Sequence, residues 1–589
     1  MMSSWHNFFY ISYDPGGFVS VDKPPIALWI QVACAKIFGI HSWSLMLPEA
    51  LAAVGSVAVL YHLTKRIFGY LAGIIASFAL AITPIFIAVS RSNNPDAILV
   101  FLLVLAAWQL IEAANKGNLK HLILAAVLIG LGFNTKMLVA FLVVPSFLLV
   151  YLFASYIKLL KKCIHLVIFG MVLLAVSFSW VIAVDLTPVS QRPYVGSSST
   201  NSEMNLVFGY NGFSRVTQYN FTSENGLNAG NHAAESSSSM KSPGSMGNFK
   251  LFNIYFGQQI NWFAALAAFG VLSALFYCKS LSGEEKNQKL RYLLLWGSWV
   301  FIMYLFFSVY QNMTHRYYTA VLAPGLASLV GIGISCFRKM RRHPFMALAF
   351  PVTLIISAGY QLFIVSVYHS LARVLTPILI AGIFFAVILI GIAFFKKKNL
   401  GAKKCSRILS ICCLAILFLA PAYWSFTTVI GRVPQADPYA GPGLLTKALP
   451  DFQSIVKKLS LNTSDLKIPD YYKQTANYLE AYQESAEYLA AVPSASLMSE
   501  YLILLTGKPV MNIGGYSGTN AILTLDQFKQ KVSSGKLKYF ITDSHADSSV
   551  NTDIINWVVE NGKKVNTNIT DKTKTSSNYS IYDISVIYS

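Results

Sequence analysis

The sequence predicts a polytopic α-helical membrane protein of about 12 spans, followed by a small α/β domain outside the membrane. Of the 589 residues, 54% are hydrophobic and only 12% are charged, whereas soluble globular proteins carry about 25% charged residues. Apolar runs of about 20 residues, the length needed to cross a bilayer, recur up to position 430. Beyond that position the composition changes to that of a soluble domain.

Twelve apolar runs have spanning length, and they lie at 43–64, 71–90, 97–114, 120–135, 137–157, 164–186, 258–278, 292–310, 315–337, 344–368, 372–395 and 406–430. An earlier apolar run, Pro24–Ile40, is shorter and is interrupted by Gln31 and Lys36. We therefore interpret Pro24–Ile40 as a helix that lies at the membrane interface.

Basic residues are unevenly distributed between the two sides of this predicted bundle. One set of short connections holds 21 Lys and Arg residues, and the alternate set holds only four, namely Arg91, Lys136, Arg316 and Arg373. Because short cytosolic connections carry the excess of Lys and Arg, we assign the first set to the cytosol. The loop 187–257 and the C-terminal region then lie outside the cytosol. Most of the net charge of +20 follows from this topology, so it does not indicate nucleic-acid binding.

The position of the N-terminus conflicts with this topology. Twelve spans put both ends of the chain on one side, yet residues 1–23 contain neither a signal sequence nor a span that could carry them across. We therefore expect one further N-terminal span upstream of Met1, and we expect the chain as given to be impaired as an enzyme. If Pro24–Ile40 were a true span instead, Lys65 and Arg66 would face outward.

We divide the chain into a transmembrane domain at 1–430, a linker at 431–460 and a soluble domain at 461–589. The transmembrane domain includes two segments outside the cytosol, at 1–42 and 187–257. Pro434, Pro438 and Pro442 mark the linker.

The soluble domain shows short β-like runs that alternate with helical patterns, which is typical of an α/β fold. The expected strands lie at 488–492, 509–513, 539–542 and 580–587, and the expected helices near 471–485, 495–506, 524–534 and 553–561. A glycine-rich turn, Gly514–Gly518, follows the second strand. It lacks the Lys-Ser/Thr pair of a phosphate loop, so we interpret it as a tight turn or a sugar-contacting loop.

Four polar clusters lie at the expected outer face of the bundle, where other charges are scarce. They contain Asp22 with Lys23, Asp96 after Asn94-Pro95, Lys136, and the run His315-Arg316-Tyr317. Each has a structural explanation: a solvated ion pair, an acid favoured at a helix start, a snorkelling lysine or an interfacial aromatic belt. Together they supply acids and cations at one membrane surface, which suits chemistry on a phosphate-bearing lipid.

Several motifs resemble those of the GT-C glycosyltransferases, and more closely the protein O-mannosyltransferase and aminoarabinose-transferase group, glycosyltransferase family 39. The resemblance is carried by Asp22-Lys23-Pro24-Pro25, followed by a short helix, and by Leu47-Pro48-Glu49-Ala50-Leu51. Asn94-Pro95-Asp96 and the segments 12–18, 188–196 and 514–518 resemble the bacterial YkcA/YkcB-like branch. The similarity covers essentially the whole chain.

The resemblance implies roles for individual residues. It implies that Lys23 and Asp96 form a pair at the lipid phosphate, and that Asp22 is an acid able to hold a divalent metal ion. We take Asp96 and Asp22 as candidate catalytic residues, with Lys23, Lys136, His315, Arg316 and Tyr317 as candidate phosphate-binding residues. The acid proposed as base in the family belongs to a loop that would precede Met1.

We therefore predict an inverting membrane glycosyltransferase that moves a mannose- or glucose-like hexose from a polyprenyl-phosphate carrier to an extracytosolic acceptor. The acceptor could be a cell-envelope polymer, a lipid or a protein. The expected partners are the lipid-linked donor, that acceptor, the bilayer and a membrane synthase of polyprenyl-phosphate sugars, without nucleic acid. Two alternatives stay open: a transporter or flippase of lipid-linked sugars, and another lipid-phosphate-dependent transferase such as a ligase.

Overall fold

The computed structural model describes residues 1–154, 157–213, 250–310, 315–341, 343–394, 400–445, 468–542, 550–565 and 579–587. By its internal contacts the chain divides into two units. Unit 1 contains Met1–Lys36, Phe178–Met240 and Thr463–Ser589, and unit 2 contains Ile37–Ser177 and Lys241–Asn462. The predicted domain division differs from this one, because the two outer segments of the predicted transmembrane domain contribute residues to the same unit as the C-terminal domain.

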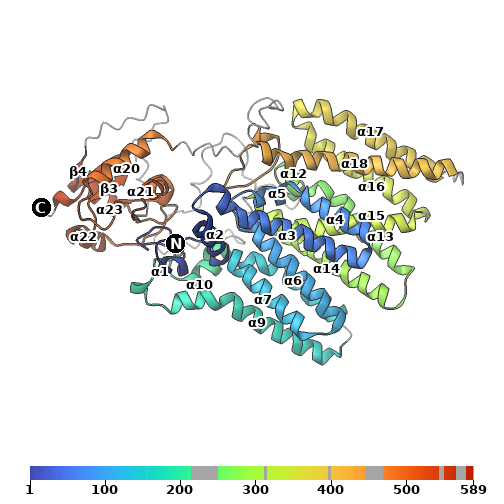
Figure 1. Cartoon of the computed structure of the whole chain (residues 1–589), viewed down its shortest axis with the longest axis horizontal. Helices are drawn as coiled ribbons and strands as arrows, with labels where there is room; N and C mark the ends of the chain where they lie inside the picture. The colour runs from blue at the N-terminus through green and yellow to red at the C-terminus, as the bar shows by residue number, and fades with distance from the viewer. Residues whose placement is uncertain are drawn as a thin grey trace. The chain divides into compact units, whose positions relative to one another are not determined.

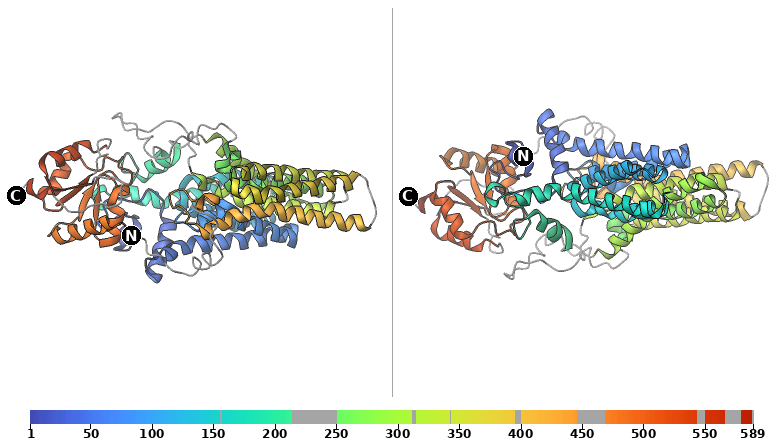
Figure 2. Two further views of the ribbon diagram at one scale, coloured as in Figure 1. Left: turned by 90° about the horizontal axis from the view of Figure 1, so that it is seen from above. Right: turned by 90° about the horizontal axis from the view of Figure 1, so that it is seen from below.

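Unit 2 is a bundle of long apolar helices that run side by side (Figures 1 and 2). Its helices are α3 (Ser42–Phe68), α4 (Tyr70–Ala81), α5 (Pro84–Ser90), α6 (Asp96–Lys116), α7 (Leu119–Lys136), α8 (Val144–Ala154), most of α9 (Leu159–Leu186), α12 (Ile254–Ile260), α13 (Ala264–Lys279), α14 (Gly283–Val309), α15 (Ala323–Met340), α16 (Pro344–Ser366), α17 (His369–Phe394) and α18 (Leu400–Ile430). Short 3₁₀ segments join some of them, including η1 (Met137–Val143) and η7 (Arg316–Leu322).

The described residues contain ten helical stretches long and apolar enough to cross a membrane, or 11 if the bent pair α4 and α5 counts as one span. The bend of 64° falls at Pro84, which lacks the N–H that would continue the helical ladder. One of the ten stretches, Leu119–Phe153, has 35 residues. A straight helix of that length would measure about 52 Å, well beyond the hydrocarbon thickness of about 30 Å.

This long stretch turns back on itself at Met137. The rings of Phe133 and Phe141 stack with centroids 5.0 Å apart, whereas eight residues of a straight α-helix rise about 12 Å. Met137 has a φ of +49°, which breaks the helix. Among the described residues, counting the bent pair α4 and α5 as one span, and α7 and the η1–α8 arm as separate crossings, gives twelve, which agrees with the predicted division of 120–157.

Close backbone contacts hold the centre of the bundle together, where small residues let helices approach. A Cβ atom on Gly270 of α13 would lie 2.0 Å from the carbonyl oxygen of Leu329 in α15. A Cβ atom on Gly331 of α15 would lie 2.3 Å from the carbonyl oxygen of Ala72 in α4. Glycine at these positions is therefore a packing requirement for α4, α13 and α15.

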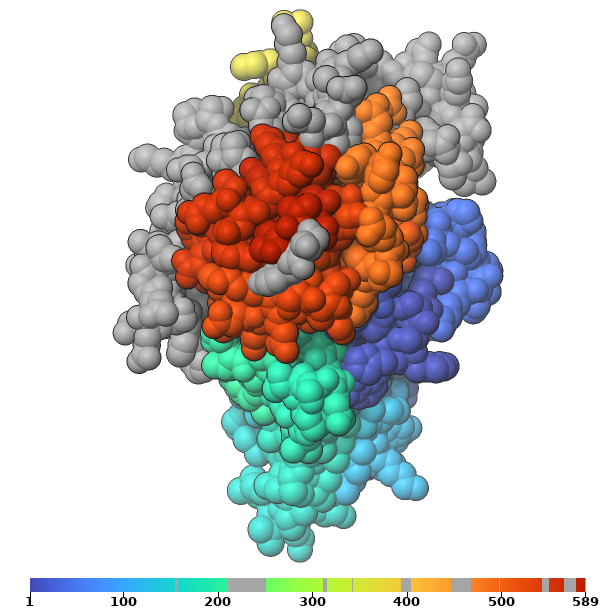
Figure 3. Space-filling view, turned by 90° about the vertical axis from the view of Figure 1, so that its left-hand side faces the viewer, coloured from blue at the N-terminus to red at the C-terminus, as the bar shows by residue number. Residues whose placement is uncertain are grey.

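Unit 1 is assembled from three separate segments of the chain. The N-terminal segment carries α1 (Trp5–Phe9) and most of α2 (Pro25–Phe38), and the middle segment carries α10 (Glu203–Asn205) and the π-helical η3 (Leu206–Phe213). The helix α2 lies within the run Pro24–Ile40, where the sequence predicts a helix; its position at the membrane interface stays a prediction. In Figure 3 the dark-blue N-terminal segment and the green middle segment adjoin the orange-to-red C-terminal domain.

The C-terminal domain contains a five-stranded sheet in the order β2-β1-β3-β5-β4. Its strands and helices are α20 (Asp470–Tyr482), β1 (Ala490–Val492), α21 (Glu500–Thr506), β2 (Val510–Asn512), α22 (Leu525–Ser533), β3 (Tyr539–Thr542), α23 (Thr552–Asn561), β4 (Lys563–Lys564) and β5 (Ser580–Asp583). β1 pairs in parallel with β2 and β3, while β5 pairs antiparallel with β3 and β4. The predicted helices and the strands predicted at 488–492, 509–513 and 539–542 are confirmed. The strand predicted at 580–587 ends at Asp583 and is followed by the 3₁₀ segment η11 (Ser585–Ile587), and β4 is an addition.

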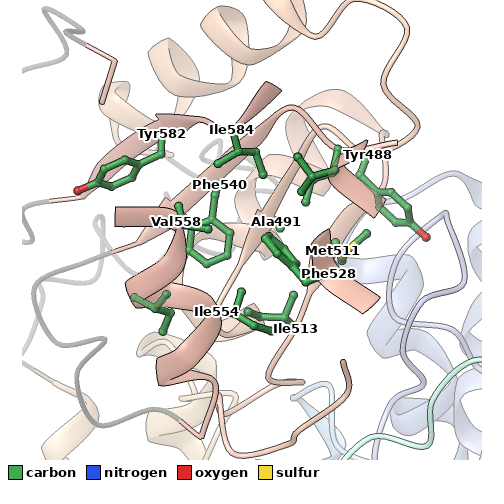
Figure 4. Close-up of a cluster of buried hydrophobic side chains, with 13 residues drawn as sticks. Tyr488, Ala491, Met511, Ile513, Phe528, Phe540, Ile554, Val558, Tyr582 and Ile584 are labelled. Carbon is green, nitrogen blue, oxygen red and sulfur yellow. The ribbon is translucent and has the colours of Figure 1, made fainter. Parts of the chain in front are cut away.

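Side chains alternate between the two faces of this sheet, as a strand requires. Ala491, Met511 and Phe540 pack with Phe528 of α22 and Val558 of α23 (Figure 4). Their neighbours on the same strands pack on the opposite face in a second core cluster, with Leu479 of α20 and Leu502 of α21. The domain thus has three layers, with helices on both faces of a buried sheet.

We predict that Gly270→Ala lowers the stability of the bundle by about 1–3 kcal/mol, the usual cost of adding a methyl group to a closely packed interior. The added Cβ would overlap the backbone of α15. Thermal unfolding of the purified protein in detergent, followed by tryptophan fluorescence, measures this. Gly359→Ala is the matched control, since its Cβ would have nothing within 4 Å; equal midpoints for both variants would contradict the packing account.

Candidate functional site

Asp96 is held at the first turn of α6 in unit 2. Its side chain is 0% exposed, and its backbone N–H donates to Asn94 Oδ1 at 3.1 Å. The N-cap of α6 is Pro95 rather than Asn94, so the Asn94 side chain binds the first helical N–H from one residue before the cap. An acid in this position is favourable with the helix dipole. A fully buried carboxylate nevertheless needs a partner, because an isolated buried charge is costly.

Lys136 provides that partner from the end of α7. Because α6 and α7 are consecutive spans that pack against each other, the end of one lies beside the start of the other. Lys136 Nζ forms an ion pair with Asp96 Oδ2, and the Lys136 side chain is only 10% exposed. The Nζ atom also lies 4.2 Å from the ring centroid of Tyr317 and 5.1 Å from that of Tyr318. Lys136 is thus a buried partner rather than a snorkelling surface lysine.

Glu49 adds a second acid to this cluster. It lies inside α3, is 0% exposed, and its Oε2 accepts the backbone N–H of Ile98 at 3.2 Å. The charges of Asp96 and Lys136 both act on it. Ionisable groups inside a membrane bundle are costly and commonly functional. The sequence contained Glu49 in the motif 47–51, but gave no sign that it faces Asp96.

Arg316 and His315 gather around Asp437. The backbone N–H and Nε of Arg316 each donate to Asp437 at 2.9 Å, and the Tyr255 hydroxyl donates to the same carboxylate at 2.9 Å. His315 Nδ1 lies 3.9 Å from Asp437 Oδ1. Asp437 belongs to the predicted linker, so this interaction anchors the described part of the linker to the bundle. Arg316 therefore has a structural role, and its phosphate-binding role stays a prediction.

Asp22 and Lys23 lie in unit 1, just before α2. Lys23 Nζ forms an ion pair with Asp22 Oδ1 at 2.9 Å, and its side chain is 40% exposed. Ser197 Oγ donates to Asp22 Oδ2 at 3.5 Å. The ammonium group of Lys23 is therefore accessible to a ligand, while the carboxylate of Asp22 is also held by the hydroxyl of Ser197.

The middle segment brings two further acids to unit 1, and sequence reasoning missed both. Asp185 accepts hydrogen bonds from the Ser202 hydroxyl and from the backbone N–H groups of Glu203 and Met204. Glu203 is only 1% exposed, and its Oε2 has no hydrogen-bond partner among the described residues. Burial, together with the charges of Asp185 and Asp22, raises the pKa of Glu203 to about 8, against the opposing effect of Arg192.

Tyr13, Glu500 and Tyr516 form another polar group of unit 1. Burial raises the pKa of Glu500, while the hydroxyls of Tyr516 and Tyr13 favour its charged form. Nearby, Asp14 is 0% exposed and accepts the N–H of Gly16 at 2.8 Å and of Phe18 at 3.1 Å. Burial outweighs these hydrogen bonds and raises the pKa of Asp14 to about 6.

The structure thus brings Asp96 together with Lys136 and Tyr317, and Asp22 together with Lys23. These two groups belong to different units. Among the described residues, no group of three or more His, Cys, Asp and Glu side chains has the arrangement of a metal site. The Asp22 carboxylate instead contacts Lys23 and Ser197. A divalent metal at Asp22 stays a prediction, and the contacts of Asp22 with the Lys23 ammonium group and the Ser197 hydroxyl do not support it. We therefore assign no chemical step to a metal.

We predict that the stability of unit 1 falls as the pH rises from about 4.5 to about 8. Above about 4.5, Glu203 loses its proton in the unfolded chain but keeps it in the folded one until about pH 8. The folded state then binds more protons than the unfolded state, so its stability decreases with pH. Glu203→Gln is neutral at every pH and should flatten this dependence.

Apparent unfolding midpoints across that pH range test this expectation. Glu560→Gln, which changes an exposed acid of α23, serves as the control and should keep the wild-type slope. The same slope in wild type and Glu203→Gln would show that Glu203 is not protonated in the folded protein.

Comparisons with known proteins identify the fold and the family. Residues 22–181 match the family described as dolichyl-phosphate-mannose-protein mannosyltransferase, and residues 475–561 match the C-terminal domain of the YkcB-like mannosyltransferase family. A solved structure of ArnT from Cupriavidus metallidurans, bound to undecaprenyl phosphate, superposes with a TM-score of 0.50 at 12% identity and covers 99% of this chain and 92% of its own. At that identity the likeness concerns the fold alone.

Two proteins of Bacillus subtilis (strain 168) are similar over nearly the whole chain. "Putative mannosyltransferase YkcB" is 36% identical, and the match covers 96% of this chain and 87% of YkcB. "Putative mannosyltransferase YycA" is 33% identical, with 98% and 91% covered. These similarities confirm the resemblance and the class of enzyme predicted from the motifs. The chain belongs to the YkcB-like family of membrane glycosyltransferases.

Proposed function

We propose that this enzyme transfers a hexose, mannose- or glucose-like, from a polyprenyl-phosphate carrier to a hydroxyl group of an acceptor outside the cytosol. The single observation that carries this proposal is the buried pair of Asp96 and Lys136 beside Tyr317, at the predicted outer end of two spans. A lysine held there by a carboxylate suits a phosphate that reaches the membrane surface on a lipid.

In this proposal the lysines act on the leaving group. A bond forms between the acceptor oxygen and the anomeric carbon, and the bond from that carbon to the phosphate oxygen breaks. The lipid phosphate keeps the electron pair, and a lysine, for which Lys23 and Lys136 are the candidates, stabilises the charge that develops on it. The acceptor proton passes to a carboxylate, for which Asp22 and Asp96 are the candidates.

The fold of ArnT supports the choice of donor, because an ArnT structure contains undecaprenyl phosphate. The match to dolichyl-phosphate-mannose-protein mannosyltransferases supports a hexose carried on a polyprenyl phosphate. The expected extracytosolic position of unit 1 favours an acceptor on that side of the membrane. Such an acceptor would be a cell-envelope polymer, a lipid or a protein. A membrane synthase of the lipid-linked sugar would supply the donor.

We predict that Lys23→Ala and Asp96→Asn each lower transfer by at least about tenfold, equal to about 1.4 kcal/mol of transition-state stabilisation. Lys23→Ala removes a cation from the leaving phosphate, and Asp96→Asn removes the charge that holds Lys136. The assay uses proteoliposomes with mannosyl- or glucosyl-phosphoundecaprenol and a cell-envelope extract, and it measures the release of undecaprenyl phosphate. Lys120→Ala, at an exposed position on the opposite end of α7, is the control.

The same assay separates the alternative functions. Movement of the labelled donor across the bilayer without release of undecaprenyl phosphate would identify a flippase. Transfer of a whole glycan chain rather than one hexose would identify a ligase. Wild-type activity in both Lys23→Ala and Asp96→Asn would mean that these residues have only structural roles.

We further predict that the C-terminal domain lies outside the cytosol. The excess of Lys and Arg in the alternate connections supports this orientation. A reporter that is active only outside the cytosol, fused after residue 589, should be active, and the same reporter at position 399 should be inactive. The opposite pattern of reporter activity would show that the topology is inverted, so that the proposed site would not face an extracytosolic acceptor.

A further inference from the structure

The glycine-rich turn of the C-terminal domain contacts the segment that holds Asp22, and Asn520 makes the contact. Its Oδ1 accepts the backbone N–H of Ser197 at 3.1 Å, and its Nδ2 donates to the carbonyl of Ser198 at 3.1 Å. One buried amide thus pairs with two consecutive backbone groups of the middle segment. All of these residues belong to unit 1.

Asn520 is itself held firmly by the turn. Its backbone N–H donates to the carbonyl of Gly514 at 3.1 Å, and its carbonyl accepts from Asn551 Nδ2 at 3.1 Å. Gly515 has a φ of +71°, and a Cβ there would lie 2.4 Å from Asn520 Oδ1. The glycine is therefore required both by the backbone conformation and by the position of this amide.

Ser197 connects Asn520 to Asp22, because its backbone N–H binds Asn520 and its hydroxyl binds Asp22. It has a φ of +62°, unusual for a residue with a side chain, and its hydroxyl faces Asp22. Just before it, a Cβ on Gly196 would lie 2.4 Å from the carbonyl oxygen of Ser20. The backbone N–H of Ser20 also donates to the carbonyl oxygen of Tyr194 at 2.8 Å, so the N-terminal and middle segments pair directly. The segment that leads into Asp22 and Lys23 therefore rests directly on the segment that Asn520 holds.

The N-terminal segment also docks on the C-terminal domain at a second place. Phe18 packs against the core cluster that contains Tyr488, and a Cβ on Gly16 would lie 2.9 Å from Pro509. The chain segment that precedes Asp22 thus contacts the C-terminal domain directly through Gly16 and Phe18, and Ser197, which binds Asp22, contacts it through Asn520.

From these contacts we propose that Asn520 is a positioning residue of the transfer site. Acting through Ser197, it holds Asp22, and with Asp22 the ion-paired Lys23, in the geometry needed for transfer. This inference rests on the proposed function, and it gives the C-terminal domain a part in catalysis. Misplacement of a reacting group by about 1 Å can cost about a hundredfold in rate.

The test uses the full chain in proteoliposomes, with mannosyl-phosphoundecaprenol as the probe. We expect Asn520→Ala to lower kcat by at least about tenfold while the Kd for undecaprenyl phosphate changes less than about threefold, because the positioning of Asp22 and Lys23 is lost but most lipid contacts stay. Asn561→Ala, which changes an exposed Asn of the same domain, should match wild type. Asn520→Asp keeps the acceptor for Ser197 and should recover part of the rate.

Two further measurements separate positioning from a general structural role. In an Asp22→Asn background, Asn520→Ala should cause little additional loss, since the residue through which it acts is already changed. Hydrogen exchange at the Ser197 amide should be faster in Asn520→Ala than in wild type. Unchanged turnover in Asn520→Ala, or losses that simply multiply with Asp22→Asn, would overturn the inference. Failure of the proposed function is distinct, because wild type itself would then transfer no sugar.

Discussion

In the helix bundle, the buried charges of Asp96 and Lys136 depend on each other as an ion pair. Burying either charge alone would be strongly unfavourable, and removal of one partner from such a pair typically costs about 3–5 kcal/mol. The pair joins the start of α6 to the end of α7 and brings Lys136 against two tyrosines that begin the 25-residue stretch Arg316–Met340. The second acid, Glu49, adds α3 to the same cluster. Apolar residues would pack there at lower cost, so this arrangement suits chemistry better than stability.

Unit 1 follows a different physical rule, since its site is organised by backbone hydrogen bonds at glycine-containing turns. A methyl group would not fit at Gly16 or Gly196, which lie against neighbouring segments, or at Gly515, which lies against Asn520 of its own turn. The C-terminal sheet, buried on both faces by its helices, supplies a rigid support for these turns. Functional groups carried on loops need such a scaffold to be held accurately.

The sequence predicts those parts of the fold that depend on local patterns. Apolar runs mark the spans, including the two arms that meet at Met137, and β-like runs mark four of the five strands. β4, with only Lys563 and Lys564, is too short and too polar to leave a pattern. The contacts that make the site are long-range: Ser197 and Asn520 are 323 positions apart, and Arg316 and Asp437 are 121 apart. Nothing in the neighbourhood of Glu49 or Glu203 reveals that these carboxyl groups are buried, because their burial depends on segments far away in the chain.

The proposed transfer requires that a polyprenyl phosphate binds at Lys23 or Lys136. A cryo-EM structure of the full chain with undecaprenyl phosphate in lipid nanodiscs tests this most directly. We predict phosphate density in hydrogen-bonding contact with the Nζ atom of Lys23 or Lys136, with the isoprenoid chain along the bundle. Phosphate density at a position remote from both lysines, with the Asp96–Lys136 pair unchanged, would contradict the account.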